Sequence, residues 1–76
     1  MTQHYTIAVA PVEGGWSVAC DAVREPMMFL SGGRAEAQAR ALAMRLSEAG
    51  DEVELTVRDR AHVLVGRASY PGQELA

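Results

Sequence analysis

Residues 34–49, RAEAQARALAMRLSEA, have the strongest helical period in the chain and contain no proline, glycine or β-branched residue. This pattern predicts an amphipathic helix, and no other stretch of the sequence predicts a second one. At roughly 100° per residue, alanine and leucine collect on one side, which is expected to pack against a sheet built by the flanking segments. The stripe predicted to be buried consists of Ala35, Ala39, Leu42, Leu46 and Ala49.

Both ends of this helix carry recognisable signals. Ser31 and Gly33 are alternative N-caps, and a cap at Gly33 would place Glu36 at the third helical position, near the positive end of the helix dipole. Glu36 and Arg40 also form an i,i+4 pair in the stabilising orientation, worth about 0.3 kcal/mol. Gly50, directly after the last turn, predicts a left-handed C-cap.

Three strands are expected before the helix. Residues 5–10 alternate large and small side chains, Pro11 is expected to end this strand, and residues 16–20 resume the alternation after a loop of about five residues. The two stretches therefore predict a hairpin. Residues 27–30, MMFL, are apolar on both faces. They indicate either a central strand covered on both sides or a strand whose outer face meets a partner chain.

A second hairpin is expected after the helix. Residues 52–59 place an apolar side chain at every second position, with Val53, Leu55 and Val57 expected to point inward. Residues 62–68 mirror this pattern after a tight turn near Asp59 and Arg60. Residues 71–76 contain turn formers and little that can be buried, so this tail is expected to be frayed.

These elements predict an α+β domain with the order β-β-β-α-β-β, in which a mainly antiparallel sheet of four or five strands packs on one helix. The 76 residues contain no linker, so a single domain is expected over 1–76, with an ordered core over about 4–70. A chain this short buries only about 60% of its unfolded surface. Self-association as a homodimer is therefore expected to add stability.

Composition narrows the classes of function. The single cysteine excludes an internal disulfide, and we expect a cytoplasmic protein. No stretch approaches the roughly 18 apolar residues of a membrane span, so no membrane association is expected. A formal charge of −3 argues against a domain that a broad basic field holds to nucleic acid.

The sequence offers few residues for catalysis. A cysteine nucleophile would need Cys20 beside His4 or His62, the two histidines of the chain. Cys20, however, shares its predicted strand face with Trp16 and Val18, which favours a buried structural thiol. These residues also lack the spacing of metal ligands. We therefore expect neither a catalytic site nor a bound metal.

Two glycine pairs could approach a phosphate, since Gly32 and Gly33 precede the predicted helix and Gly14 and Gly15 form another pair. Neither pair belongs to a nucleotide-binding motif, and turn or cap roles explain both. No cofactor is expected, and the protein is predicted not to be an enzyme.

Five residues are candidates for contact with another protein. Met27 and Phe29 belong to the apolar third strand, whereas Ala37, Ala41 and Met44 fall together on the second side of the helix. Small residues beside a methionine suit a contact surface. The alternative explanation is that alanine raises helix propensity on a solvent-exposed face.

The arginines of the last hairpin are the candidates for contact with nucleic acid. Arg58, Arg60 and Arg67 form the only basic concentration in the chain. Acidic residues interleave with them, and this pattern favours a solvated strand face with internal ion pairs over a track for phosphates.

Three stretches resemble a family of small bacterial proteins known only as a domain of unknown function: GGWSV at 14–18, FLSGGRAEAQARALA at 29–43, and an acidic-apolar hairpin that ends with RASYPG at 67–72. The resemblance extends from about Val9 to Gly72. Members of that family usually have an Asp-Gly turn in the last hairpin, where this chain has Asp59 and Arg60. The resemblance implies a fold and no activity. The matching positions are Trp16, Val18, Ala37, Ala41, Ser69 and Tyr70.

The chain is also similar to HicB-type antitoxin domains, which run from a tyrosine-initiated strand through a Gly-Gly-aromatic hairpin to a helix rich in glutamate and alanine. Their Pro-Gly-Cys turn is replaced here by REPMMFLS, residues 24–31. This similarity implies a regulatory module that binds nucleic acid.

Together these observations predict a non-enzymatic interaction domain that forms a homodimer through its open sheet face or an edge strand. The alternative hypothesis is a weak nucleic-acid-binding or antitoxin-like regulatory module.

Overall fold

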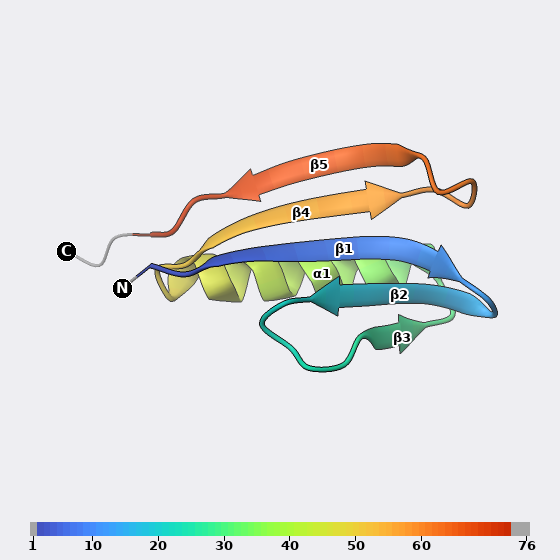
Figure 1. Ribbon diagram of the computed structural model, residues 1–76, viewed down its shortest axis with the longest axis horizontal. Helices are drawn as coiled ribbons and strands as arrows, with labels where there is room; N and C mark the ends of the chain where they lie inside the picture. Colours follow the sequence, from blue (N-terminus) through green and yellow to red (C-terminus); the bar gives the residue numbers. More distant parts are fainter. Residues whose placement is uncertain (1, 74–76) are drawn as a thin grey trace.

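A five-stranded sheet with one helix on one of its faces makes up residues 2–73, the part of the chain that the computed structural model describes (Figure 1). The α+β class and the predicted order of elements are confirmed. No helix within these residues has the length and apolar character needed to cross a membrane. The elements are β1 (His4–Val12), β2 (Gly15–Cys20), β3 (Met27–Phe29), α1 (Gly32–Glu48), β4 (Glu52–Arg58) and β5 (Leu64–Tyr70).

The strands lie in the order β3-β2-β1-β4-β5, so β3 and β5 form the two edges. Three of the four strand pairs are antiparallel, whereas β1 and β4 run parallel and place Ile7 opposite Leu55. A parallel pair needs a crossover connection, and α1 lies in the connection that leads from β3 to β4. The sheet is therefore mixed, with the two hairpins meeting at β1 and β4.

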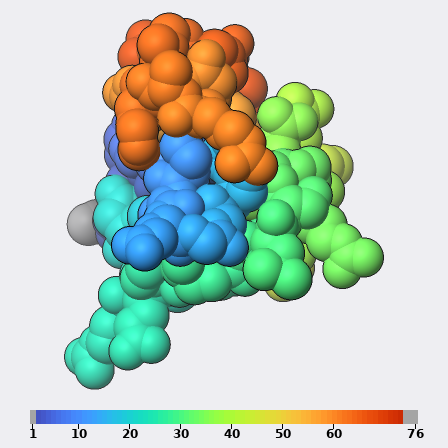
Figure 2. Space-filling view, turned by 90° about the vertical axis from the view of Figure 1, so that its right-hand side faces the viewer, coloured from blue at the N-terminus to red at the C-terminus, as the bar shows by residue number. Residues whose placement is uncertain are grey.

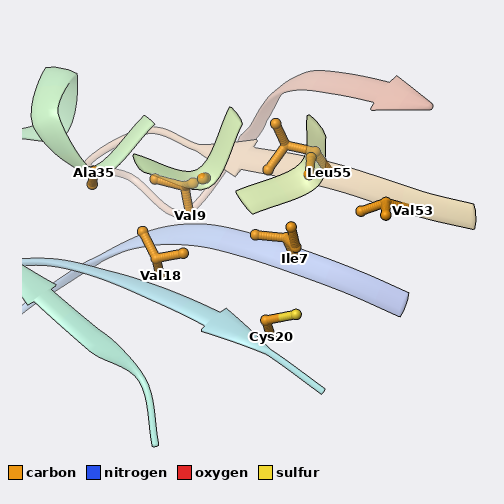
Figure 3. Packing of buried hydrophobic residues seen from close by; sticks show 9 residues of the cluster. Ile7, Val9, Val18, Cys20, Ala35, Val53 and Leu55 are labelled. Carbon is orange, nitrogen blue, oxygen red and sulfur yellow. The ribbon is translucent and has the colours of Figure 1, made fainter. Parts of the chain in front are cut away.

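The core lies between the central strands and α1 (Figure 3). Ile7, Val9, Val18 and Leu55 are its largest fully buried side chains, and they alternate along their strands with residues of the opposite sheet face. The helix meets them with alanine, whose small side chain lets the helix approach the sheet closely. The buried apolar residues are Ile7, Val9, Val18, Cys20, Ala35, Ala39, Ala43, Val53 and Leu55.

The helix begins two residues before the predicted stretch 34–49, and the predicted cap at Ser31 is confirmed. Ser31 is the N-cap, and its hydroxyl oxygen accepts a hydrogen bond of 3.2 Å from the backbone N–H of Arg34. Both Gly32 and Gly33 lie in the first turn, so the alternative cap at Gly33 is wrong. A side chain at Gly32 would meet the ring of Trp16, with its Cβ 2.9 Å from Cε2. The helix therefore starts with glycine where the indole lies against it.

The C-terminal end confirms the predicted cap. Gly50 has a φ of +97°, and its N–H donates to the carbonyl of Ser47 at 3.0 Å. The N–H of Asp51 donates to the carbonyl of Leu46 at 3.0 Å. This pair of bonds is the Schellman motif, which satisfies the last carbonyls of a helix.

The buried stripe of α1 differs in part from the prediction. Ala35 and Ala39 are buried, and the two predicted leucines pack half-buried against the core, but Ala49 is exposed. The fully buried row instead continues at every fourth residue through Ala43 and Ser47. Ser47 escaped the prediction because it is polar. Its hydroxyl donates to the carbonyl of Pro71 at 2.6 Å, which satisfies it in the interior.

The prediction that Pro11 ends the first strand is wrong. β1 continues to Val12, which pairs with Gly15, so the hairpin loop contains two residues rather than about five. The pairing of β1 with β4 ends at Val9, and Pro11 therefore lies where only β2 flanks the strand. A proline is tolerated at such a position because no ladder bond is needed on the free side.

The second hairpin has a longer loop than predicted. β5 begins at Leu64, and residues 59–63 form a connection rather than a tight turn. A carboxylate oxygen of Asp59 accepts bonds from the N–H groups of Ala61 (2.8 Å) and Val63 (3.1 Å). His62 has a φ of 61°, a left-handed conformation that the surrounding bonds hold in place.

Residues 71–73 differ from the expected frayed tail. The N–H of Gln73 donates to the carbonyl of Ser47 at 2.9 Å, in addition to the bond from the Ser47 hydroxyl to Pro71. Gly72 lies so close to Gly50 that an added Cβ would overlap the Gly50 carbonyl oxygen. The end of β5 is thus tied to the end of α1, and the rest of the predicted tail, 74–76, lies outside the described residues.

Candidate interaction surfaces

The face of the sheet opposite α1 carries mostly small side chains. The strand register places Ala8 and Ala10 of β1 beside Ala19 and Ser17 of β2, and these residues range from half-buried to exposed. The connection 21–26 protrudes from the body of the molecule (Figure 2). It borders a shallow cavity of about 280 Å³ on this face, which Thr6, Ala8, Ala19 and Arg24 help to line.

The apolar third strand lies at an edge of the sheet rather than in its centre. Met27 pairs with Val18 and Phe29 pairs with Trp16, and both side chains pack against the core. Only Met28, which is 60% exposed, projects to the open face. Met27 and Phe29 therefore serve mainly to close the core at β3, which leaves them little surface for a partner.

The helix residues predicted to form a contact surface lie away from the sheet. Ala37 is exposed, Ala41 is half-buried and Met44 is 53% exposed. The structure thus separates these residues from Met27 and Phe29, which lie on the core side. Met44 instead faces the C-terminal edge of the sheet, where it lines a cavity of about 320 Å³ together with Tyr70.

The strand β5 forms an exposed surface that no pattern in the sequence predicted. It has seven residues, none of them buried, and it pairs only with β4. Leu64 is 40% exposed and Val65 is 60% exposed. In Figure 1 the helix runs along β1, and β5 lies beyond β4, on the outer side of the sheet. The alternation in residues 62–68 predicted a strand here, but alternation carries no information on its neighbours.

A shallow groove separates β5 from the flank of α1. One cavity of about 230 Å³ lies between them, with Glu36 and Arg40 on the helix side and Val65 and Gly66 on the strand side. The predicted ion pair between Glu36 and Arg40 is present, with Oε2 and Nη2 3.3 Å apart. The helix therefore presents a paired charge, and no large apolar side chain, to this part of β5.

The three candidate arginines do not converge on one surface. Arg67 Nε lies 3.0 Å from Glu54 Oε1, and Arg58 donates a bond of 3.1 Å to the carbonyl of His62. Arg60 lies over the ring of Trp16, 5.7 Å from its centroid. Each guanidinium group thus has its own intramolecular contact.

Cys20 is a buried thiol, as predicted. Burial is the largest influence and raises the pKa of this thiol, and the neighbouring carboxylate of Asp21 acts in the same direction. The N–H of Ala22, which donates to the sulfur at 3.4 Å, opposes this shift. A thiol with a raised pKa forms little thiolate near neutral pH, and the thiolate is the reactive form.

The two histidines lie at opposite ends of the sheet. His4 starts β1 and approaches Glu52 at 3.8 Å, whereas His62 belongs to the loop after β4. Neither residue is held against Cys20 by a hydrogen bond among the described residues. Residues 2–73 also contain no group of three His, Cys, Asp or Glu side chains placed to hold a metal ion.

Comparison of the chain with protein-family models, with curated proteins and with solved structures finds no match.

Proposed function

We propose that this chain is a small, cytoplasmic, non-enzymatic interaction domain that acts as a homodimer. The observation that carries the proposal is the asymmetry of the sheet, whose helix covers one face and leaves β5 without a single buried residue. A strand that lacks a neighbour on one side exposes backbone groups that another chain can pair.

Exposed apolar side chains near this edge support the same proposal. Leu64, Val65 and Met44 are each at least 40% exposed, and all three lie on β5 or on the helix flank beside it. Burial of apolar surface contributes roughly 25 cal/mol per Å², so covering this region would stabilise a domain whose own core is small.

The non-enzymatic part of the proposal rests on the placement of the reactive groups. The thiol of Cys20 is buried with a raised pKa, and the two imidazoles are at opposite ends of the sheet. Nucleophilic catalysis needs a base within hydrogen-bond reach of an accessible nucleophile, and this arrangement supplies neither condition.

Sedimentation equilibrium over the micromolar range tests the proposal. We expect a mass of twice the 8.2 kDa chain at the upper concentrations. A protein that stays monomeric throughout this range would contradict the homodimer. Titration with duplex and single-stranded DNA at two salt concentrations tests the alternative hypothesis, because binding that weakens steeply with salt would favour a nucleic-acid-binding module.

A further inference from the structure

The outer edge of β5 has few of the features that keep edge strands apart. Its seven residues, LVGRASY, include no proline, and Arg67 is their only charged residue. Natural sheets usually protect such an edge with charges, prolines, bulges or a very short strand. The charge of Arg67 is partly neutralised within the chain by Glu54, 3.0 Å away.

The irregularity in the β4–β5 ladder is confined to the loop end. The register shifts between Val57 and Arg58, whereas residues 66–70 of β5 pair regularly with β4. The bulge therefore protects only the first part of the edge. A regular segment from Gly66 to Tyr70 remains available to another strand.

We propose that β5 pairs antiparallel with β5 of a second copy of this chain, with Ala68 on the two-fold axis. The pairing joins two five-stranded sheets into one continuous sheet. This inference rests on the proposed homodimer and specifies its interface. An antiparallel arrangement of identical strands is self-complementary, as a two-fold interface requires.

The charge and size of the side chains favour an axis at Ala68 over the adjacent registers, in which the axis passes through Arg67 or Gly66. An axis at Arg67 would place two arginines directly opposite each other, and like charges at this position are destabilising. An axis at Gly66 would put two glycines opposite each other and would set Arg67 against the irregular residue Val65.

An axis at Ala68 avoids both conflicts. Arg67 then lies opposite Ser69 of the second copy, and Gly66 lies opposite Tyr70 of the second copy. An aromatic side chain across from a glycine is a known way to fill the space that the glycine leaves in a sheet. The groove beside Gly66, with its cavity of about 230 Å³, leaves room for such a contact.

A pair of charge variants at Ser69 tests the interface. Ser69 is exposed, and in this register it faces Arg67 of the second copy while it pairs with Glu54 of its own chain. We expect Ser69→Lys to weaken dimerisation about tenfold at low salt and Ser69→Glu to strengthen it by a similar factor, because two such pairs form across the axis.

The same substitutions separate dimerisation from folding. Within one chain, lysine at position 69 gains an interaction with Glu54 and glutamate is repelled by it, so their effects on monomer stability have the opposite sign. A loss of dimer in Ser69→Lys therefore cannot be explained by unfolding. Sedimentation gives the dimer dissociation constant, and denaturant unfolding gives the stability.

Cysteine cross-linking tests the register itself. In a Cys20→Ala background, Ala68→Cys should form an intermolecular disulfide on oxidation, because residues directly opposite in antiparallel strands have Cα atoms about 4.5 to 5.5 Å apart. Arg67→Cys is the matched control. Its thiol would lie diagonally from its counterpart and should cross-link far less.

The outcomes distinguish the two proposals. A wild-type protein that is monomeric overturns both the homodimer and this interface. If the wild type is a dimer, but its dissociation constant is unchanged by Ser69→Lys and Ser69→Glu and Ala68→Cys does not cross-link, the β5 interface is wrong and the homodimer proposal still holds. Efficient cross-linking through position 67 instead of 68 overturns the proposed axis.

Discussion

The two edges of the sheet are built in opposite ways. The β3 edge has only three residues, of which Met27 and Phe29 pack against the core. The β5 edge has seven residues, none buried, and faces the helix flank that carries Arg40 and Met44. A short edge strand resists pairing, whereas a long one, of which only Tyr70 packs against the core, invites it.

This contrast indicates that the exposure of β5 comes from where the helix lies and not from a shortage of apolar residues. The two leucines of the helix pack against the core, whereas Leu64 and Val65 lie exposed at the start of β5. The proposed pairing of β5 with a second copy supplies the neighbour that the chain itself does not provide. Four predictions test the contrast.

The largest expected effect compares one leucine of the central sheet with one of the β5 edge. Leu55→Ala should lower the free energy of unfolding by about 3 kcal/mol, because Leu55 is 2% exposed and its removal leaves a cavity under the helix. Leu64→Ala, at a site 40% exposed, should lower it by less than about 1 kcal/mol. Denaturant unfolding at one fixed protein concentration measures both.

An equal loss of unfolding free energy in Leu55→Ala and Leu64→Ala would contradict the difference between the central sheet and the β5 edge. They would show that β5 contributes to the core as much as β4 does. The fixed concentration matters because dimerisation adds to the apparent stability.

The second prediction concerns the protected edge, where Trp16 lies between Phe29 and the start of α1. Gly32→Ala should cost about 1 to 2 kcal/mol, because its Cβ would come within 2.9 Å of the indole and displace it. Gly33→Ala is the matched control. A Cβ there lies 3.6 Å from the Ser31 hydroxyl oxygen, so the change should be neutral or slightly stabilising through helix propensity.

Thermal unfolding of the two glycine variants gives the comparison directly. If Gly32→Ala is as stable as Gly33→Ala, the indole can move without loss and the packing of Trp16 does not secure this edge.

The sequence predicted which side chains share a face of the sheet better than it predicted which strands lie next to each other. A period of two shows which side chains of a strand share a face, so the inward residues Val53 and Leu55 were predicted correctly. It does not show which strand lies beside which, because that depends on long-range pairing. For this reason residues 27–30 could be interpreted as a central strand, although β3 lies at an edge.

Several contacts of the candidate surfaces left no signal in the sequence. Ser47 is polar, so a hydrophobic stripe could not include it, and its hydrogen bond to Pro71 joins residues that are far apart in the chain. The contact of Arg60 with Trp16 likewise depends on the long-range pairing of β1 with β4, which places the two hairpins side by side. In contrast, the cap at Gly50 is a local property and was predicted.

The third prediction tests the anchor at the end of β5. Ser47→Ala removes the hydroxyl that donates to Pro71 and should lower the free energy of unfolding by about 1 kcal/mol. It should also speed hydrogen exchange at Gln73, whose N–H is bonded to the Ser47 carbonyl. Unchanged exchange at this amide would mean that the backbone bond alone holds residues 71–73.

The smallest expected effect is at the loop of the second hairpin, between β4 and β5. Arg60 lies 5.7 Å from the centroid of the Trp16 ring, and an exposed cation–π contact contributes about 0.5 kcal/mol. Arg60→Ala should therefore destabilise the protein by about this amount and change the emission of Trp16, the only tryptophan in the chain. Arg24→Ala, which removes an exposed arginine from the connection between β2 and β3, is the control and should leave the emission unchanged.

An identical spectrum for Arg60→Ala and the wild type would show that the guanidinium group does not rest on the indole in solution. The packing at the β3 edge would then depend on Gly32 and Phe29 alone, and the two edges of the sheet would differ less than proposed.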